Sequence, residues 1–246
     1  MDRLVYIAMS GAKETLQAQA ANNSNLANAS TTGFRASLSA FQSQAVAGSG
    51  LPSRVYATDT AIGWDGSSGS LEQTGRDLDV AVQGSGWIAV QAPDGTEAYT
   101  RAGDLRVDAS GLLTNGAGHP VLTDGGPLTV PPHASISVAR DGSVSIVPLG
   151  QTANTVANVG RIKLVNPPDS ALERGPDGLF RMGDGTQAES DASVHLTSGV
   201  LESSNVNIAE TMTQMIELAR RYELQVKAIR TAEDDASASS KLLQSA

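Results

Sequence analysis

The side chains best suited to chemistry in this 246-residue chain are three histidines and the acidic residues of its turns. His119, His133 and His195 do not have the HxxxH spacing that places two zinc ligands on one helix face, and the chain has no cysteine. Neither a GxSxG elbow nor a phosphate-binding P-loop occurs. The stretch 183–185, with Ala188 after it, is a fragment of a dinucleotide fingerprint without the flanking strand and helix, so a turn explains it better. We therefore predict no catalytic, cofactor-binding or metal-binding residues, and we do not expect an enzyme.

The overall composition excludes further classes of partner. The formal net charge is −9, from 17 basic and 26 acidic residues, and the basic residues form no stripe. Because nucleic acids and anionic membranes attract clustered Lys and Arg, neither is an expected partner, and no small-molecule substrate is expected. The N-terminal residues lack the basic and long apolar regions of a cleavable signal peptide, and the apolar run 4–9 is too short to span a bilayer.

Without a chemical site, the function must follow from the structural elements, and both ends of the chain carry the same repeat. Alternating steps of four and three residues join Val5, Met9, Ala12, Leu16, Gln19, Asn23 and Leu26 near the N-terminus. The same steps join Ile208, Met212, Met215, Ala219, Tyr222, Val226 and Ile229 near the C-terminus. Such a repeat keeps one stripe of a helix facing a partner helix. We predict one helix that stops at Thr31–Gly33 and a second that Asn207 caps, with Glu210 three residues later.

The N-terminal helix has no charged residue from Thr15 to Phe34. A helix on the surface of a monomer normally shows a charged outer face. This helix either packs weakly on its own domain or becomes buried among polar neighbours when subunits stack, and we favour the second interpretation. Its asparagines are poor helix formers, so alone in water it should be marginal. Our hypothesis is that both ends are disordered or loosely helical in the monomer and fold on assembly.

The residues between the two helices have a β pattern. Leu78, Val80 and Val82 alternate with other residues as in a half-buried strand, and residues 87–91 form a second apolar run. Residues 53–62 have the alternation of one arm of a long hairpin, while 34–41 continue the first helix as a short amphipathic segment. Asp-Gly or Asn-Gly pairs, which favour tight hairpin turns, recur at 94–95, 115–116, 124–125, 141–142, 177–178 and 184–185.

The predicted fold class is α+β. A discontinuous, coiled-coil-like helical domain formed by the two terminal helices is joined to a central antiparallel all-β domain. The predicted divisions are an N-terminal axial helix over 1–33, an extended linker or hairpin segment over 34–76, a β-rich domain over 77–204, and a C-terminal axial helix over 205–246.

Five motifs, in order along the chain, resemble those of the axial proteins of the bacterial flagellum, the basal-body rod family. Ala21–Ala36 is similar to "NNLANxxTxGF(R/K)", although Ser24 and Asn25 stand between the asparagine pair and Leu26. The others are Thr74–Trp87, similar to "TGRxLDxAIxGxGFF"; Tyr99–Asp104, similar to "YTRAGxF"; Asp108–Leu113, similar to "DxxGxLV"; and Gly199–Val206, similar to "GxLExSNV".

The resemblance implies a structural subunit of the rod, the drive shaft that crosses the periplasm and transmits torque. The implied partners are copies of itself, other proximal and distal rod subunits, and the flagellar type III export apparatus, which would export the chain without a cleaved signal peptide. The expected subunit-interface residues are the members of both repeats together with Asn22, Asn28, Thr31, Gly33 and Phe34. Within the family the likeness is to a proximal-rod member. A distal-rod subunit is the nearest alternative, and a secreted β-rich binding module is a more distant one.

Overall fold

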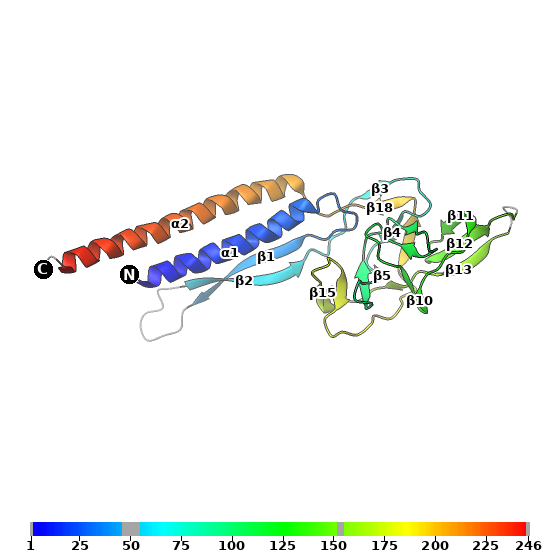
Figure 1. Ribbon diagram of the computed structural model, residues 1–246, viewed down its shortest axis with the longest axis horizontal. Coiled ribbons are helices and arrows are strands. Elements are labelled where there is room, and N and C mark those ends of the chain that lie inside the picture. The colour runs from blue at the N-terminus through cyan, green and yellow to red at the C-terminus, as the bar shows by residue number, and fades with distance from the viewer. Residues whose placement is uncertain (1, 46–54, 152–154, 245–246) are drawn as a thin grey trace. The chain divides into compact units, whose positions relative to one another are not determined.

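The computed structural model describes residues 2–45, 55–151 and 155–244, and the chain forms two compact units. The helical unit comprises Met1–Ala29, Ala36–Asp65 and Val206–Ala246, and the β unit comprises Ser30–Arg35 and Gly66–Asn205. The two α-helices are α1 (Asp2–Ala27) and α2 (Ile208–Gln244), and antiparallel strands lie between them in the sequence (Figure 1). The fold is therefore α+β, as predicted.

In the helical unit, α1 ends at Ala27, earlier than the predicted stop at Thr31–Gly33. Asn25 explains how the chain turns back, because its side chain holds the start of the next strand. The Asn25 Nδ2 donates to the Ser37 carbonyl oxygen at 2.9 Å, and its Oδ1 accepts from the Ser37 amide at 2.8 Å. An amide that competes for backbone groups thus favours an exit from the helix at this point.

Strands β1 (Ser37–Ala45) and β2 (Val55–Trp64) form a long antiparallel hairpin that packs along α1 (Figure 1). β2 confirms the hairpin arm predicted over 53–62. The expected amphipathic continuation over 34–41 is wrong, since Ser37–Phe41 pairs with Asp59–Trp64. Local periodicity did not reveal this strand because its partner strand lies beyond residues 46–54, which are outside the described part of the chain. Both strands lie within the linker or hairpin segment predicted over 34–76.

At the other end, the predicted cap of α2 is confirmed. The Asn207 Oδ1 accepts hydrogen bonds from the amides of Ala209 at 3.1 Å and Glu210 at 3.3 Å. These amides belong to the first helical turn, which has no partners within the helix. The acid–base pair Glu217–Arg221 lies on this helix, with its charged atoms 4.0 Å apart.

The β unit contains short strands that pair antiparallel. Its largest sheet has the strand order β14-β5-β6-β16-β15, and a second sheet has the order β11-β12-β13. The strands are β3 (Leu71–Gln73), β4 (Val80–Gln83), β5 (Trp87–Gln91), β6 (Glu97–Thr100), β7 (Arg106–Val107), β8 (Leu113–Thr114), β9 (Leu122–Thr123), β10 (Gly126–Pro127), β11 (His133–Val138), β12 (Ser143–Pro148), β13 (Ala157–Arg161), β14 (Leu164–Val165), β15 (Leu172–Arg174), β16 (Phe180–Met182), β17 (His195–Ser198) and β18 (Val200–Glu202), with a 3-10 turn at Asp169–Ala171.

The core of the β unit consists mainly of Val, Leu and Ile side chains, as the low aromatic content requires. β5 coincides with the apolar run predicted at 87–91. β4 differs from its prediction as a half-buried strand, because Val80, Ala81 and Val82 are all buried. Both faces of β4 are covered, and the small side chain of Ala81 leaves room for this.

The predicted positive φ is present at Gly95, Gly142, Gly178 and Gly185, but not at Gly116 or Gly125. Gly142 has φ +85°, which an Asp-Gly hairpin turn requires. In the loop predicted at Asn115-Gly116, the glycine with positive φ is Gly118, at +89°. The Asn115 Oδ1 instead accepts from the His119 amide at 2.9 Å, so a wider loop is stabilised by the asparagine side chain.

Candidate functional site

The hydrogen-bonded contacts between α1 and α2 lie beside the predicted repeats rather than on them. The residues of α1 buried inside the helical unit are Ala12, Glu14, Thr15, Ala18 and Asn22. Those of α2 are Thr211, Leu218 and Ala232. Ala12 is itself a member of the 4-3 repeat, and Glu14 is unrelated to it. Each of the other buried residues lies one position before a member of the repeat or, for Ala232, before its continuation at Glu233. One residue corresponds to a rotation of about 100° around a helix axis.

The contact between the two helices is made by small and polar side chains. The Asn22 Nδ2 donates to the Thr211 carbonyl oxygen at 2.8 Å, and the Thr15 hydroxyl donates to the Gln225 Oε1 at 3.0 Å. At Gly11, a Cβ atom would lie 2.9 Å from the Gln225 Nε2, so the close approach there suits glycine. This contact buries few large apolar groups, and its hydrogen bonds provide direction more than hydrophobic stabilisation.

The rotation leaves large apolar side chains of both helices on the outside of the chain. We call these residues the outer stripe, and each is about half exposed or more: Tyr6, Met9 and Leu16 on α1, and Ile208, Met212, Ile216 and Leu224 on α2. Met9, Leu16, Ile208 and Met212 also belong to the predicted repeats. On α2 the stripe residues are four or eight positions apart, the spacing of a ridge that packs against another helix.

The other predicted interface residues have mixed environments. Partly buried positions are Val5, Gln19, Leu26, Asn28, Met215, Ala219, Tyr222, Val226 and Ile229, while Asn23 and Thr31 are exposed. Gly33 and Phe34 are buried inside the β unit. A contact within the chain therefore accounts for the residue types at these two positions without an intersubunit contact.

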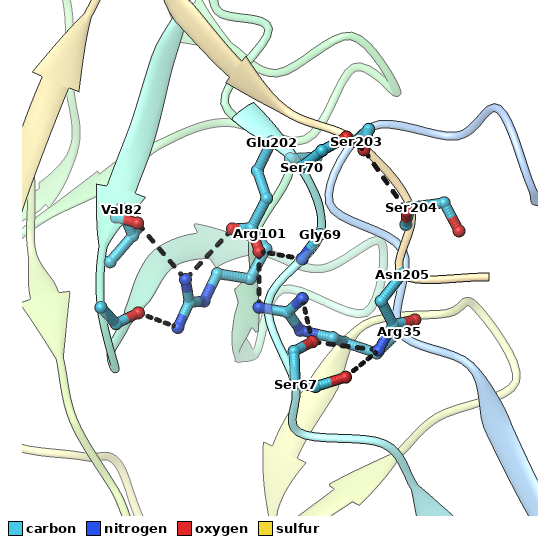
Figure 2. Close-up of polar contacts among 12 residues, drawn as sticks. Arg35, Ser67, Gly69, Ser70, Val82, Arg101, Glu202, Ser203, Ser204 and Asn205 are labelled. Carbon is cyan, nitrogen blue, oxygen red and sulfur yellow. Dashed lines mark hydrogen bonds and ion pairs between the residues drawn. The ribbon is translucent and has the colours of Figure 1, made fainter. Parts of the chain in front are cut away.

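A buried charge cluster in the β unit was not predicted. Its centre is Glu202, whose side chain is 1 % exposed, in β18. The Glu202 Oε1 lies 2.8 Å from the Arg35 Nη2, and its Oε2 accepts from the Arg101 Nη1 at 3.1 Å. Figure 2 shows the carboxylate between the two guanidinium groups. Removing one partner of such a pair typically costs about 3–5 kcal/mol, because a buried charge is left uncompensated.

Backbone groups complete the cluster. The Arg35 Nη1 donates to the Ser67 carbonyl oxygen at 2.6 Å (Figure 2). The Arg101 Nη2 donates to the Gly84 carbonyl oxygen at 2.7 Å. The Gly69 amide donates to the Glu202 Oε1 at 3.0 Å. Burial lowers the pKa of Arg101, and the neighbouring carboxylate of Glu202 opposes that shift. The charged groups of the cluster therefore form ion pairs with one another and hydrogen bonds with the backbone.

Aromatic rings and a further arginine lie beside the cluster. The Arg174 guanidinium lies 4.3 Å from the centre of the Phe34 ring and 5.7 Å from that of Phe180, and its Nη1 donates to the Arg35 carbonyl oxygen at 2.9 Å. The Arg101 guanidinium lies 5.4 Å from the centre of the Trp87 ring. Such cation–π contacts strengthen as water is excluded.

The sequence contains a partial signal for this cluster. Arg35, Arg101 and Glu202 are the charged residues inside the motifs "GF(R/K)", "YTRAG" and "GxLExSN". Three charged residues within otherwise small or apolar motifs suggest a buried network, but their separations of 66 and 101 positions gave no indication that they meet.

Within the described residues, no group of three or more His, Cys, Asp or Glu side chains is placed to hold a metal ion. The perturbed groups also have structural explanations. Burial raises the pKa of Tyr99 to about 12, and its hydroxyl accepts from the Ala188 amide at 2.7 Å. In the part of the chain that the structure describes, no helix combines the length and the apolar character needed to cross a membrane.

Comparison with known proteins decides the family. Three family profiles match: "Flagella basal body rod protein" over residues 5–35, "Flagellar hook protein FlgE/F/G D1 domain" over 81–146, and "Flagellar basal body rod FlgEFG protein C-terminal" over 197–242. The chain is 47 % identical to the flagellar basal-body rod protein FlgF of Escherichia coli over 99 % of both chains. It belongs to the flagellar basal-body rod protein family.

Further relatives agree with this assignment. FlgF of Salmonella typhimurium is 46 % identical over 99 % of both chains, whereas FlgG of Bacillus subtilis is 32 % identical over 95 % of this chain and 96 % of its own. This rod protein is therefore FlgF-like, as its motifs predicted, and it is a structural component of the flagellar basal body. The relatives are structural rod proteins rather than enzymes.

Proposed function

We propose that this rod protein assembles helically in the proximal rod and joins its neighbours through the outer stripe of α1 and α2. The observation that supports the proposal is the exposure of that stripe, with Leu16 48 % exposed and Met212 53 % exposed. Exposed apolar side chains that are aligned along two helices are suited to burial against other helices. Neighbouring copies and other proximal and distal rod subunits would supply those helices.

The proposed packing is coiled-coil-like and open-ended. Because Met9 and Leu16 are seven positions apart on α1, and the stripe residues of α2 form a ridge with steps of four, the stripe can pack against helices of adjacent subunits. A helical stack needs heterologous interfaces, which join different patches and do not close into a ring. The uncharged stretch from Thr15 onward can then be surrounded on all sides. Gln19 and Asn23 would lower the stability of that packing and fix its register.

The proposed role in the motor is mechanical. A drive shaft must transmit torque through subunits that keep their shape, and the buried charge cluster supplies directional contacts inside each β unit. Export by the flagellar type III apparatus and a position in the periplasm-spanning rod are further parts of the proposal. They rest on the family and on the resemblance of the motifs.

The experiment that tests the proposal compares two substitutions on α2 in a strain that lacks its own copy of the protein. Met212→Asp puts a carboxylate on the outer stripe, whereas Gln214→Asp puts one on the face that carries Glu217 and Arg221. We expect Met212→Asp to abolish motility and incorporation into isolated basal bodies, and Gln214→Asp to retain both. Equal behaviour of the two variants would contradict the proposal. Labelling of the subunit in isolated basal bodies would distinguish a proximal from a distal position.

A further inference from the structure

Three separate passages of the chain meet at Glu202, and each leads between the two units. The first passage is Ser30–Arg35, which follows α1. The second is Gly66–Ser70, which follows the β1–β2 hairpin, and the third is Glu202–Asn205, which precedes α2. All three belong to the β unit. The chain passes between its units four times, at 29–30, 35–36, 65–66 and 205–206, and each of these junctions adjoins one of the three passages.

The contacts of Glu202 hold all three passages together. Its carboxylate contacts Arg35 in the first passage and accepts from the Gly69 amide in the second, while its own carbonyl oxygen accepts from the Gly33 amide at 2.8 Å. The third passage also pairs directly with the second, because the Ser203 amide donates to the Ser70 carbonyl oxygen at 2.8 Å. Glu202 therefore links all three passages (Figure 2).

Glycine allows this close assembly at two of the passages. Gly33 has φ +67°, and a Cβ atom there would collide with the Arg101 backbone. A Cβ atom at Gly69 would collide with the Ser203 carbonyl oxygen. At Gly69 the second and third passages are thus packed backbone against backbone, and at Gly33 the first passage packs against the backbone at Arg101.

This assembly is distinct from the apolar core of the β unit. The core cluster contains Val80, Ile88, Val144, Leu196 and similar residues, and it includes no residue of the three passages. The passages are held mainly by hydrogen bonds and by the Glu202 ion pairs. One carboxylate faces two buried guanidinium groups there, so loss of its charge leaves both without compensation.

We propose that Glu202 is a latch whose loss opens the three passages together while the core of the β unit stays folded. The latch fixes the spacing of the points at which the chain leaves the β unit. Its opening is a local event that involves a cooperative group of contacts smaller than the whole unit.

Hydrogen exchange on the full-length chain tests the proposal, with Glu202→Gln compared to the unsubstituted protein. We expect exchange at the amides of Gly33, Gly69 and Ser203 to rise by about 100-fold or more, from the loss of a buried charge partner. Exchange at core amides such as Val121, which donates to the Leu113 carbonyl oxygen at 2.8 Å, should change by less than about 3-fold. Unchanged passages, or equal loss of protection in passages and core, would overturn the proposal.

Arg35→Met provides the second variant if Glu202→Gln does not fold, because it leaves the Glu202–Arg101 pair in place. It should release the passages selectively in the same way, and uniform loss of protection would again overturn the latch. Arg181→Met is the matched control. It removes an arginine of the same unit whose pair with Asp177, at 2.6 Å, is partly exposed and distant in sequence from the passages. The control should leave exchange at Gly33, Gly69 and Ser203 unchanged.

Discussion

The helical unit and the β unit use their apolar residues in opposite ways. The core cluster of buried apolar side chains lies wholly in the β unit. Of the eleven large hydrophobic side chains found exposed among the described residues, eight lie in the helical unit. Where α1 meets α2, the contacts involve Thr15, Asn22 and Gln225. The β unit thus buries most of its large apolar side chains, whereas the helical unit exposes many of its own.

If the outer stripe is the assembly surface, as we propose, stability and assembly belong to different parts of this rod protein. Burial of apolar area is the main driving force of folding, so the β unit has its own source of stability. A surface that binds other subunits keeps its apolar area exposed in the monomer, so that area stabilises the protein only after assembly. Substitutions, hydrogen exchange and acid unfolding test this division, with expected effects that run from the largest to the smallest.

The largest effect should come from a carboxylate on the helical surface. Leu224 and Leu149 are 62 % and 63 % exposed, the first on α2 and the second in the β unit. We expect Leu224→Asp to abolish rod incorporation and swimming, because burial of an unpaired carboxylate at a subunit interface is costly. The matched change Leu149→Asp should leave swimming intact. A motile Leu224→Asp strain would contradict the division, and so would a non-motile Leu149→Asp strain.

In the isolated protein the order of sensitivity should reverse. Ile88 is fully buried, and Ile88→Ala should lower the free energy of unfolding by about 2–5 kcal/mol. Ile216 is 65 % exposed, and Ile216→Ala should change it by less than about 0.5 kcal/mol. Urea denaturation of the purified monomer measures both values. Similar losses for the two variants would mean that the helical unit holds more of the stability than its packing suggests.

A third prediction concerns the order of opening within the monomer. If the terminal helices depend on partners, their amides should exchange much faster than those of the β core in dilute solution, because helices without a well-packed apolar face are marginal. Hydrogen exchange with peptide-level resolution distinguishes α1 from β5 and β12. Strong protection over residues 4–26 in the dilute monomer would contradict folding on assembly.

The smallest effect is expected in acid, and it belongs to the β unit. Hydrogen bonds from the Ser110 hydroxyl and from the Leu112 amide lower the pKa of Asp108 below its ordinary value of 3.8. Such a group contributes stability above its unfolded pKa, and that contribution is lost as pH falls from about 4 through the lower, native pKa. The unfolding temperature should therefore fall over this range.

Asp108→Asn is the control for that prediction, because the amide oxygen still accepts hydrogen bonds but carries no charge. The fall in unfolding temperature between pH 5 and pH 2, measured calorimetrically, should be slightly smaller in this variant than in the unsubstituted protein. The pKa is also lowered for Asp141, Asp184 and Asp191, first by hydrogen bonds from the backbone of Ser143, Thr186 and Ser193 respectively. These three groups still contribute to the fall in unfolding temperature in the variant. A steeper acid slope in Asp108→Asn would have the wrong sign for this account.

Apart from the strand at Ser37–Ala45, the sequence by itself determined the main kinds of element and their order. Periodicity of 4-3 predicted helices at both ends, Asn207 predicted where α2 begins, and Asp-Gly pairs predicted turns such as that at Gly142. These features depend on residues within a few positions of one another. Local patterns are sufficient for them, because helix periodicity, capping and turn conformation are local properties of the chain.

Only the tertiary structure decided which faces and which distant residues meet. The helix contact is one residue away from the predicted repeat, because small and hydrogen-bonding side chains at Gly11, Thr15 and Asn22 allow the closest approach. β4 is covered on both faces, and Glu202 meets Arg35 from 167 positions away. A periodic pattern shows that a helix has a face for a partner, but it does not say whether that partner is in the same chain. Contacts over such separations depend on how the whole chain packs.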